Sequence, residues 1–178
     1  IAWIAFSYEK NTTEAKRIIN AISTKHNTPD FYLLKSQIAQ YEGNKSEEMD
    51  NKTAYLSMLN QSNYGAMYNK YNVLLFADDK QTAEKALEIA KIEVDHRPTP
   101  DSYDLLAWSY LNVGQNKKAL EIAQKHVVGK TSEPKAMYHL AMIYKSNNFS
   151  EKVTPIKEEL LSSSFELGPN LERKVNQL

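Results

Sequence analysis

The side chains that could take part in chemistry are few and widely spaced. The four histidines are His26, His96, His126 and His139. Metal binding from a helix normally needs ligands three or four residues apart, and no histidine has another within that spacing. We therefore interpret all four as solvent-exposed or turn residues, and we predict no metal site.

Acidic residues occur as adjacent pairs, at Glu47-Glu48, Asp78-Asp79 and Glu158-Glu159. Neighbouring residues on a helix diverge by about 100°, so neither member of a pair could face the other across a substrate bond. Cysteine is absent, and the sequence contains no Gly-x-Ser-x-Gly, no phosphate-binding glycine loop and no His-Glu-x-x-His. These observations predict a protein without catalytic residues and without a cofactor.

Charge and hydropathy exclude two further classes of function. The chain of 178 residues carries 22 basic and 22 acidic side chains, a formal net charge of zero, whereas nucleic-acid binders carry a clear basic excess. No stretch approaches 18 uninterrupted apolar residues, so we expect no membrane insertion. We expect a soluble protein. The lack of cysteine leaves the compartment open, with a slight preference for an extracytoplasmic one.

The stretch from Thr99 to Pro134 predicts two helices joined by a tight turn. Thr99 suits the N-cap and Pro100 the first helical position. Apolar residues then recur at steps of three and four as far as Val113, and Gly114 ends the helix. A second amphipathic stretch follows, with small residues such as Ala119 on its buried side.

Parts of this unit recur along the chain. Residues 85–90 are identical to residues 118–123, at an offset of 33. Leu140-Ala141 repeats Leu106-Ala107 at an offset of 34, and residues 28–32 resemble residues 99–103 at an offset of 71. A helix-turn-helix unit of about 34 residues is therefore the predicted building block.

On these residues the sequence resembles the tetratricopeptide repeat (TPR) family, and the resemblance covers essentially the whole chain. It implies an all-α, right-handed α-solenoid of about four and a half helix-turn-helix repeats with a short C-terminal capping helix. The last third is loosely similar to the C-terminal part of bacterial TPR proteins, many of which are exported. The expected boundaries are a partial repeat at 1–27, repeats at 28–62, 63–98, 99–133 and 134–163, and a cap at 169–178.

The two ends of the chain carry their own predictions. The apolar opening Ile1–Tyr8 reads as the tail of a repeat's first helix, so we expect a fragment of a longer chain. If the repeats are a spacer or oligomerisation arm, Trp3, Ile4 and Phe6 are expected to be buried against an upstream domain or a second copy. The C-terminal residues Leu171, Val175 and Leu178 are expected to cover the last repeat.

Two second helices also have predicted features. The helix at 46–59 is expected to turn Met49, Thr53, Leu56 and Leu59 inward. Pro155 lies within the helix predicted from Ser150, and it requires either a late helix start or a kink there.

The resemblance implies that the first helix of each pair lines a concave groove that binds peptides or partner helices. The residues that it places there are Tyr32, Ser36, Gln40, Asn69, Val73, Asp104, Trp108, Leu111, Asn112, Tyr138, Met142 and Lys145. Trp108, Tyr138 and Met142 would form an apolar, aromatic patch; equally, Trp108 could pack between repeats. A clamp for a C-terminal carboxylate is disfavoured. The repeats that bind such a carboxylate use lysine and asparagine side chains, and at the matching positions this chain has Tyr32, Asp104 and Tyr138.

The leading hypothesis is therefore a non-catalytic scaffold that binds a protein or peptide partner in the groove. Two alternatives remain open. The repeats could be a structural spacer or oligomerisation arm that self-associates through its uncapped N-terminal end. They could also be the accessory module of an enzyme whose catalytic domain lies upstream.

Overall fold

The computed structural model describes residues 1–62 and 64–178, and all of its regular elements are helical. Asn63, the first residue of the predicted third repeat, lies outside the described residues. The α-helices are α1 (Ala2–Ser7), α2 (Thr12–Ser23), α3 (Pro29–Glu42), α4 (Lys45–Gln61), α5 (Asn69–Ala77), α6 (Ala83–His96), α7 (Pro100–Asn112), α8 (Asn116–His126), α9 (Pro134–Ser146), α10 (Val153–Ser162), α11 (Ser164–Leu167) and α12 (Pro169–Asn176). Short 3₁₀ turns, η1 (Gly65–Tyr68) and η2 (Ser150–Lys152), precede α5 and α10. The predicted all-α fold is confirmed for the described residues.

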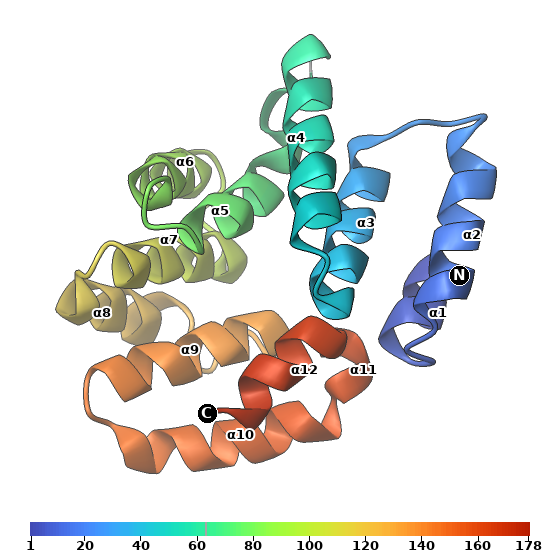
Figure 1. Ribbon diagram of the computed structural model, residues 1–178. Coiled ribbons are helices and arrows are strands. Elements are labelled where there is room, and N and C mark those ends of the chain that lie inside the picture. The colour runs from blue at the N-terminus through green and yellow to red at the C-terminus, as the bar shows by residue number, and fades with distance from the viewer. Residues whose placement is uncertain (63) are drawn as a thin grey trace. The chain divides into compact units, whose positions relative to one another are not determined.

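Consecutive helices pack as antiparallel pairs: α1 with α2, α3 with α4, α5 with α6, α7 with α8, and α9 with α10 (Figure 1). Helix starts follow the sequence signals. Pro29, Pro100 and Pro134 each occupy the first position of a helix, where the missing N–H would have had no intrahelical partner. This pairing is consistent with a helical repeat protein.

The helices form two compact units. The first unit comprises Ile1–Tyr64 together with Ser163–Gln177, and the second comprises Gly65–Ser162 with Leu178. The chain therefore leaves the first unit after α4 and returns to it with α11 and α12.

The turn that ends the first helix of a pair recurs with the repeat period. Gly43, Gly114 and Asn148 all have a positive φ, of 76°, 80° and 64°. In each case the next residue donates its backbone N–H to a carbonyl five residues earlier, at 2.9, 2.9 and 3.0 Å. This left-handed helix end is a Schellman motif. Its spacing of 71 and 34 residues shows that three pairs share one local geometry.

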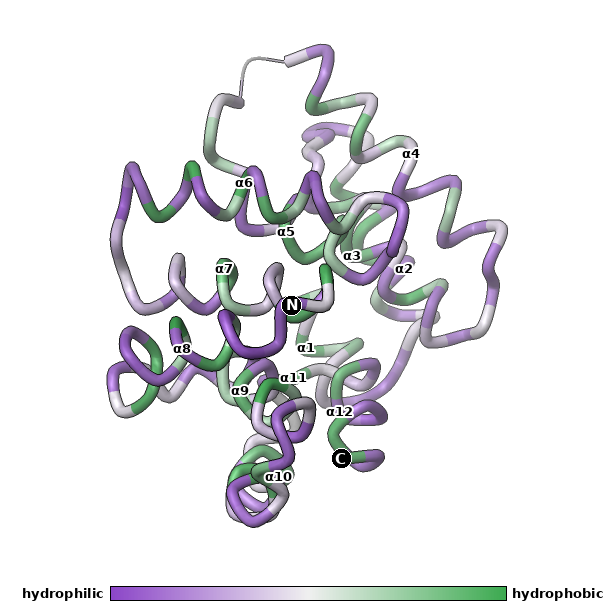
Figure 2. Tube along the Cα trace, turned by 90° about the vertical axis from the view of Figure 1, so that its left-hand side faces the viewer, coloured by the Kyte–Doolittle hydropathy of each residue, from purple (hydrophilic) through white to green (hydrophobic). Residues whose placement is uncertain are grey.

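The second helices bring small residues to the same buried position. Ala86 and Ala119, which are 33 residues apart, are both fully buried, as is Ala90. Without a larger side chain at these points, α6 and α8 can approach their neighbours closely. Figure 2 shows hydrophobic and hydrophilic residues alternating along the helices, as amphipathic packing requires.

Phe6 belongs to the core of the first unit. It is 1% exposed and packs in a cluster with Ala5, Ala15, Ile19 and Ile38. The expectation that Phe6 faces an upstream domain or a second copy is therefore wrong. The reason is that α2 and α3 cover this side of α1, so the residue finds its apolar partners within its own unit.

The predicted inward face of α4 is also wrong in part. Met49 is 63% exposed and Thr53 is exposed, whereas Tyr55 is fully buried. Leu56 and Leu59 are half-buried. Apolar residues are distributed around this helix rather than along one stripe, so periodicity did not define its buried side.

Pro155 lies in the first turn of α10, and the C-terminal segment after α10 is helical. The late helix start is confirmed, because α10 begins at Val153 and Pro155 falls in its first turn. The C-terminal segment forms the short helix α11, followed by α12. The predicted capping helix α12 packs against α3 within the first unit.

Candidate peptide-binding site

The predicted groove residues of the second unit lie on α5, α7 and α9, the first helices of three successive pairs. Asp104 and Trp108 are one turn apart on α7, and Tyr138 and Met142 are one turn apart on α9. The helices α5 and α9 both contact α7. This side of the unit therefore brings the predicted residues of three helices into one neighbourhood.

A buried ion-pair geometry joins α7 to α9. The Nδ1 atom of His139 lies 2.9 Å from Oδ2 of Asp104, and both side chains are buried. Since a carboxylate only accepts hydrogen bonds, the imidazole donates from Nδ1. The bond fixes the ring orientation of His139 and satisfies a carboxylate that would be costly to bury alone.

Trp108 covers the imidazole ring of His139. The two ring centroids are 4.2 Å apart with an angle of 15° between the planes, and Tyr138 packs against both rings at 6.1 Å. Trp108 is 6% exposed, so its ring packs mainly between neighbouring helix pairs. The polar pair and the aromatic rings together form the Asp104–His139–Trp108 cluster, the name used below.

The indole N–H of Trp108 has an unusual environment. Nε1 is buried, and among the described residues no hydrogen-bond acceptor lies within reach of it. A buried donor without a partner costs about 1–3 kcal/mol. The cluster therefore gains from aromatic stacking at the expense of one unmade hydrogen bond.

His139 has the carboxylate partner that a catalytic histidine has, but its ring is buried and is not accessible to a substrate. A carboxylate orients the general base of hydrolases in the same way. Here, however, the indole lies flat on the imidazole, and none of the described contacts of His139 is to a serine or threonine hydroxyl. The geometry favours a positioning role for His139 within the helix packing.

A small cleft opens beside the cluster. Its lining comes from the start of α5, the first half of α7 and the α8–α9 connection with the start of α9, and it is shallow, with a volume of about 20 Å³, roughly that needed for one water molecule. The lining residues are Lys70, Asp101, Asp104, Leu105, Glu133, Lys135 and Ala136. Asp104, one of the predicted groove residues, thus belongs both to the cleft and to the buried cluster.

Charges of both signs line this cleft. Lys70 Nζ lies 3.8 Å from an oxygen of Asp101, and both side chains are about half exposed. Glu133 and Lys135 stand at the start of α9, and both are exposed. The charged groups around this cleft can pair with a charged or polar group of a ligand.

The predicted groove residues on α5 have structural partners. The Asn69 amide donates to Oε1 of Glu93 at 2.8 Å, and Arg97 donates to the other oxygen of Glu93 at 2.6 Å. Glu93 is buried on α6, where the guanidinium of Arg97 balances its charge and the amide of Asn69 satisfies its other oxygen. Val73 is fully buried.

The remaining predicted residues of the second unit vary in exposure. Leu111, Asn112 and Met142 are half-buried, and Lys145 is exposed. The Asn112 amide donates to the Trp108 carbonyl one turn earlier, at 2.9 Å.

The three predicted residues on α3 belong to the other compact unit. Tyr32 is half-buried and its hydroxyl accepts from the Asn27 amide at 3.1 Å. Ser36 is buried and donates to the Leu33 carbonyl at 2.8 Å, while Gln40 is exposed.

His139 is the residue that sequence reasoning missed. It is 3% exposed in the middle of α9, so its interpretation as a solvent or turn residue is wrong. His26 and His96 are exposed as predicted, and His126 stacks on Tyr103 at 3.7 Å. A signal was present: His139 lies one position past the 34-residue equivalent of Asp104, which places the two level on neighbouring first helices.

Other site classes can be stated for the described part of the chain. Within residues 1–62 and 64–178, no group of three or more histidine, aspartate or glutamate side chains is arranged to hold a metal ion. None of the described helices is long and apolar enough to cross a membrane. Comparison of the sequence and the structure with protein families, curated proteins and solved structures gave no match.

Proposed function

We propose that this chain is a non-catalytic scaffold of the tetratricopeptide-repeat type, which binds a peptide or protein partner on the α5–α7–α9 side of its second unit. The single observation that carries the proposal is the cleft shared by these three first helices. Asp104, one of the cleft-lining residues, is held in place by its hydrogen bond to His139 before a partner arrives. Preorganisation of this kind lowers the entropic cost of binding.

Support for the repeat type comes from the recurring turns and from the sequence repeats. Helix ends at Gly43, Gly114 and Asn148 share one geometry at multiples of about 34 residues. The resemblance implies that the first helices form the binding side, and the cleft lies on that side. The mixed charges of its lining favour an extended peptide that offers both its backbone and a charged side chain.

The test uses peptides selected from a random library displayed against the native chain. Binding of a selected peptide is measured by fluorescence anisotropy on the native chain and on the Lys70→Glu/Lys135→Glu variant. The proposal expects at least tenfold weaker binding to the variant, because two cleft cations are reversed. Lys91→Glu is the matched control, since Lys91 is exposed on the second helix α6. Equal binding to all three proteins would reject the cleft as the site.

One observation favours a second function, self-association. Ile4 on α1 is 56% exposed, and the residues that flank this helix, Ile1 and Tyr8, are 90% and 73% exposed at spacings of three and four residues from it. We expect Ile4→Lys to reduce any concentration-dependent rise in mass measured by light scattering, with Lys25→Glu as a control. A native chain that stays monomeric at all concentrations would reject this second function.

A further inference from the structure

The C-terminal helix α12 lies on a defined part of α3. The Asn170 amide donates to the Gln37 carbonyl at 2.7 Å, and the Arg173 guanidinium donates to the Tyr41 carbonyl at 3.0 Å. The same guanidinium lies over the Tyr41 ring, 3.9 Å from its centroid. Asn170 and Arg173, one helical turn apart on α12, thus hydrogen-bond to two backbone carbonyls that are one turn apart on α3.

Arg173 places its positive charge at the C-terminal end of α3. Tyr41 is the penultimate residue of that helix, and its carbonyl belongs to the last turn, where carbonyls have no intrahelical partner. A cation is favoured at this negative end of the helix dipole. The ring of Tyr41 adds a cation–π contact, so one guanidinium satisfies both groups.

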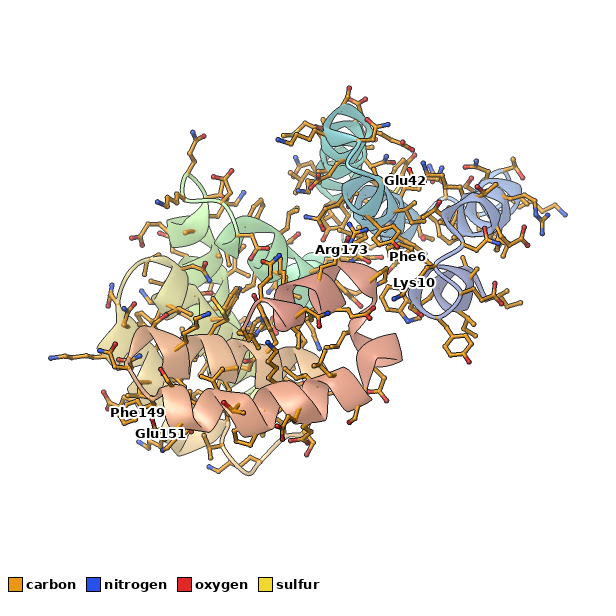
Figure 3. All side chains as sticks on the ribbon, turned by 60° about the horizontal axis from the view of Figure 1, so that its bottom comes forward. Phe6, Lys10, Glu42, Phe149, Glu151 and Arg173 are labelled. Atoms are coloured by element: carbon orange, nitrogen blue, oxygen red, sulfur yellow. The ribbon has the colours of Figure 1, made fainter. Side chains whose placement is uncertain are left out.

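Further contacts fix the direction and depth of α12. Lys10 Nζ lies 2.9 Å from Oε2 of Glu172, and Val175 is fully buried. Gly168, directly before α12, has φ 72°, and a Cβ atom there would lie 2.6 Å from Cη2 of Trp3. The segment therefore fits its place through one apolar anchor, one ion pair and one close approach of backbone to indole. Figure 3 labels Arg173 on α12, Phe6 on α1 and Lys10 in the connection between α1 and α2.

The covered face of α3 corresponds to the proposed binding side of α7. The shared turns align Gly43 with Gly114, an offset of 71 residues. At this offset Gln37 corresponds to Trp108, and Tyr41 corresponds to Asn112. Within the first unit, α12 thus occupies the face that in the second unit carries predicted groove residues.

The composition of the contact indicates that α12 can leave this face. Its hydrogen bonds and its ion pair lie at exposed positions, and its buried contacts are those of two side chains, Pro169 and Val175. The helix has 8 residues, too few to be stable alone in water, so its folding depends on docking. Segments of this kind open locally while the rest of a protein stays folded.

We propose that α12 is a self-ligand, and that the Gln37–Tyr41 face of α3 is a docking site for a short amphipathic helix that carries arginine. The ligand chemistry is that of residues 169–175: an amide and a guanidinium three residues apart, a carboxylate beside the guanidinium, and an apolar anchor two residues beyond it. A partner segment with this pattern competes with α12 for the face. This inference concerns the first unit and does not depend on the cleft of the second.

The test measures binding in trans of a fluorescein-labelled peptide with the sequence of residues 168–178. On the native chain the tethered α12 competes at an effective concentration in the millimolar range, so the peptide should bind weakly. Glu172→Lys places two ammonium groups together and opens the face, and the labelled peptide should bind this variant at least tenfold more tightly. The double variant Lys10→Glu/Glu172→Lys restores the ion pair in cis and should return binding to the native level. A labelled peptide with arginine 173 replaced by glutamate should not bind.

Two results would overturn the proposal. One is a folded Glu172→Lys variant that binds the peptide no better than the native chain does. The other comes from hydrogen exchange on the native chain, which keeps the proposal testable if the variant does not fold. Amides of α12 should exchange through local opening while α3 stays protected; exchange of both only by global unfolding would make α12 a fixed part of the fold. Because neither Lys70 nor Lys135 enters this experiment, its outcome is separate from that of the cleft.

Discussion

Asp104 of α7 and His139 of α9 form a buried hydrogen bond of 2.9 Å, which joins two successive helix pairs of the second unit. Trp108 covers the imidazole, so the bond is removed from water. Hydrogen bonds in such surroundings are expensive to break on one side only, because the remaining partner stays buried and unpaired. The pair therefore stabilises the packing of the surface that we propose as a binding site.

Asp104→Ala should lower the free energy of unfolding of the second unit by about 1–3 kcal/mol, because the Nδ1–H group of His139 loses its acceptor. The Asp104→Ala/His139→Ala double variant should cost less than the sum of the single variants. Urea unfolding followed by Trp108 fluorescence in a Trp3→Phe background reports this unit alone. Gln124→Ala, exposed on the neighbouring helix α8, is the control and should change stability by less than about 0.5 kcal/mol. Additive costs at the two buried positions would mean that the bond does not couple the helices.

Trp108→Phe should cost about 1 kcal/mol or less, whereas Trp108→Ala should cost about 3–5 kcal/mol. Phenylalanine keeps the stacked ring and removes the buried N–H that has no described partner, so the loss of volume is offset in part. Thermal or urea unfolding followed by circular dichroism measures both variants. A cost for Trp108→Phe close to that of Trp108→Ala would show that Nε1 makes an important interaction.

Gly114→Ala should destabilise the second unit by about 1–2 kcal/mol, since an L-residue is strained at φ 80°. The space around this position is open, so backbone conformation alone determines the cost. Asn148→Gly, at the equivalent turn of the next pair, should leave stability unchanged or raise it. Urea midpoints of the two variants provide the measurement. A neutral Gly114→Ala would contradict the assignment of a shared left-handed turn.

Burial lowers the pKa of His126 below its ordinary value, and the positive charges of Lys125 and Lys130 add to this effect. The folded state therefore favours the neutral imidazole. The associated stability is present above about pH 6.5 and is lost as the pH falls through the folded-state pKa. An NMR titration of the His126 ring protons should give a pKa below 6.5, and the Lys125→Gln/Lys130→Gln variant should raise it. A titration at or above 6.5 in the native chain would contradict the structure here.

The sequence predicted the helix pairs well because local signals mark them. Proline at the first helical position, glycine at the left-handed turn and the repeated Lys-Ala-Leu-Glu-Ile-Ala segment each act within a few residues. The same signals predicted little about α4, where apolar side chains occur all around the helix. They also could not place α12, because its contacts with Gln37 and Tyr41 span more than 130 residues of chain.

The sequence also indicated some residues of the candidate site and missed others. The family resemblance implied Asp104 at the groove, and the structure places Asp104 at the cleft. His139 was missed because its partner lies on a neighbouring helix, 35 residues earlier in the chain. Spacing rules within one helix cannot detect a pair of that kind, whereas comparing equivalent positions in successive helix pairs would have done so.

The most direct test of the central claim is a hydrogen-exchange footprint of a library-selected peptide on the native chain. We expect protection at the start of α5, in the first half of α7 and at the start of α9, where the cleft-lining residues lie. The Lys70→Glu/Lys135→Glu variant should lose this protection. Protection confined to the second helices α6, α8 and α10 would contradict the proposal that the chain binds its partner on the α5–α7–α9 side.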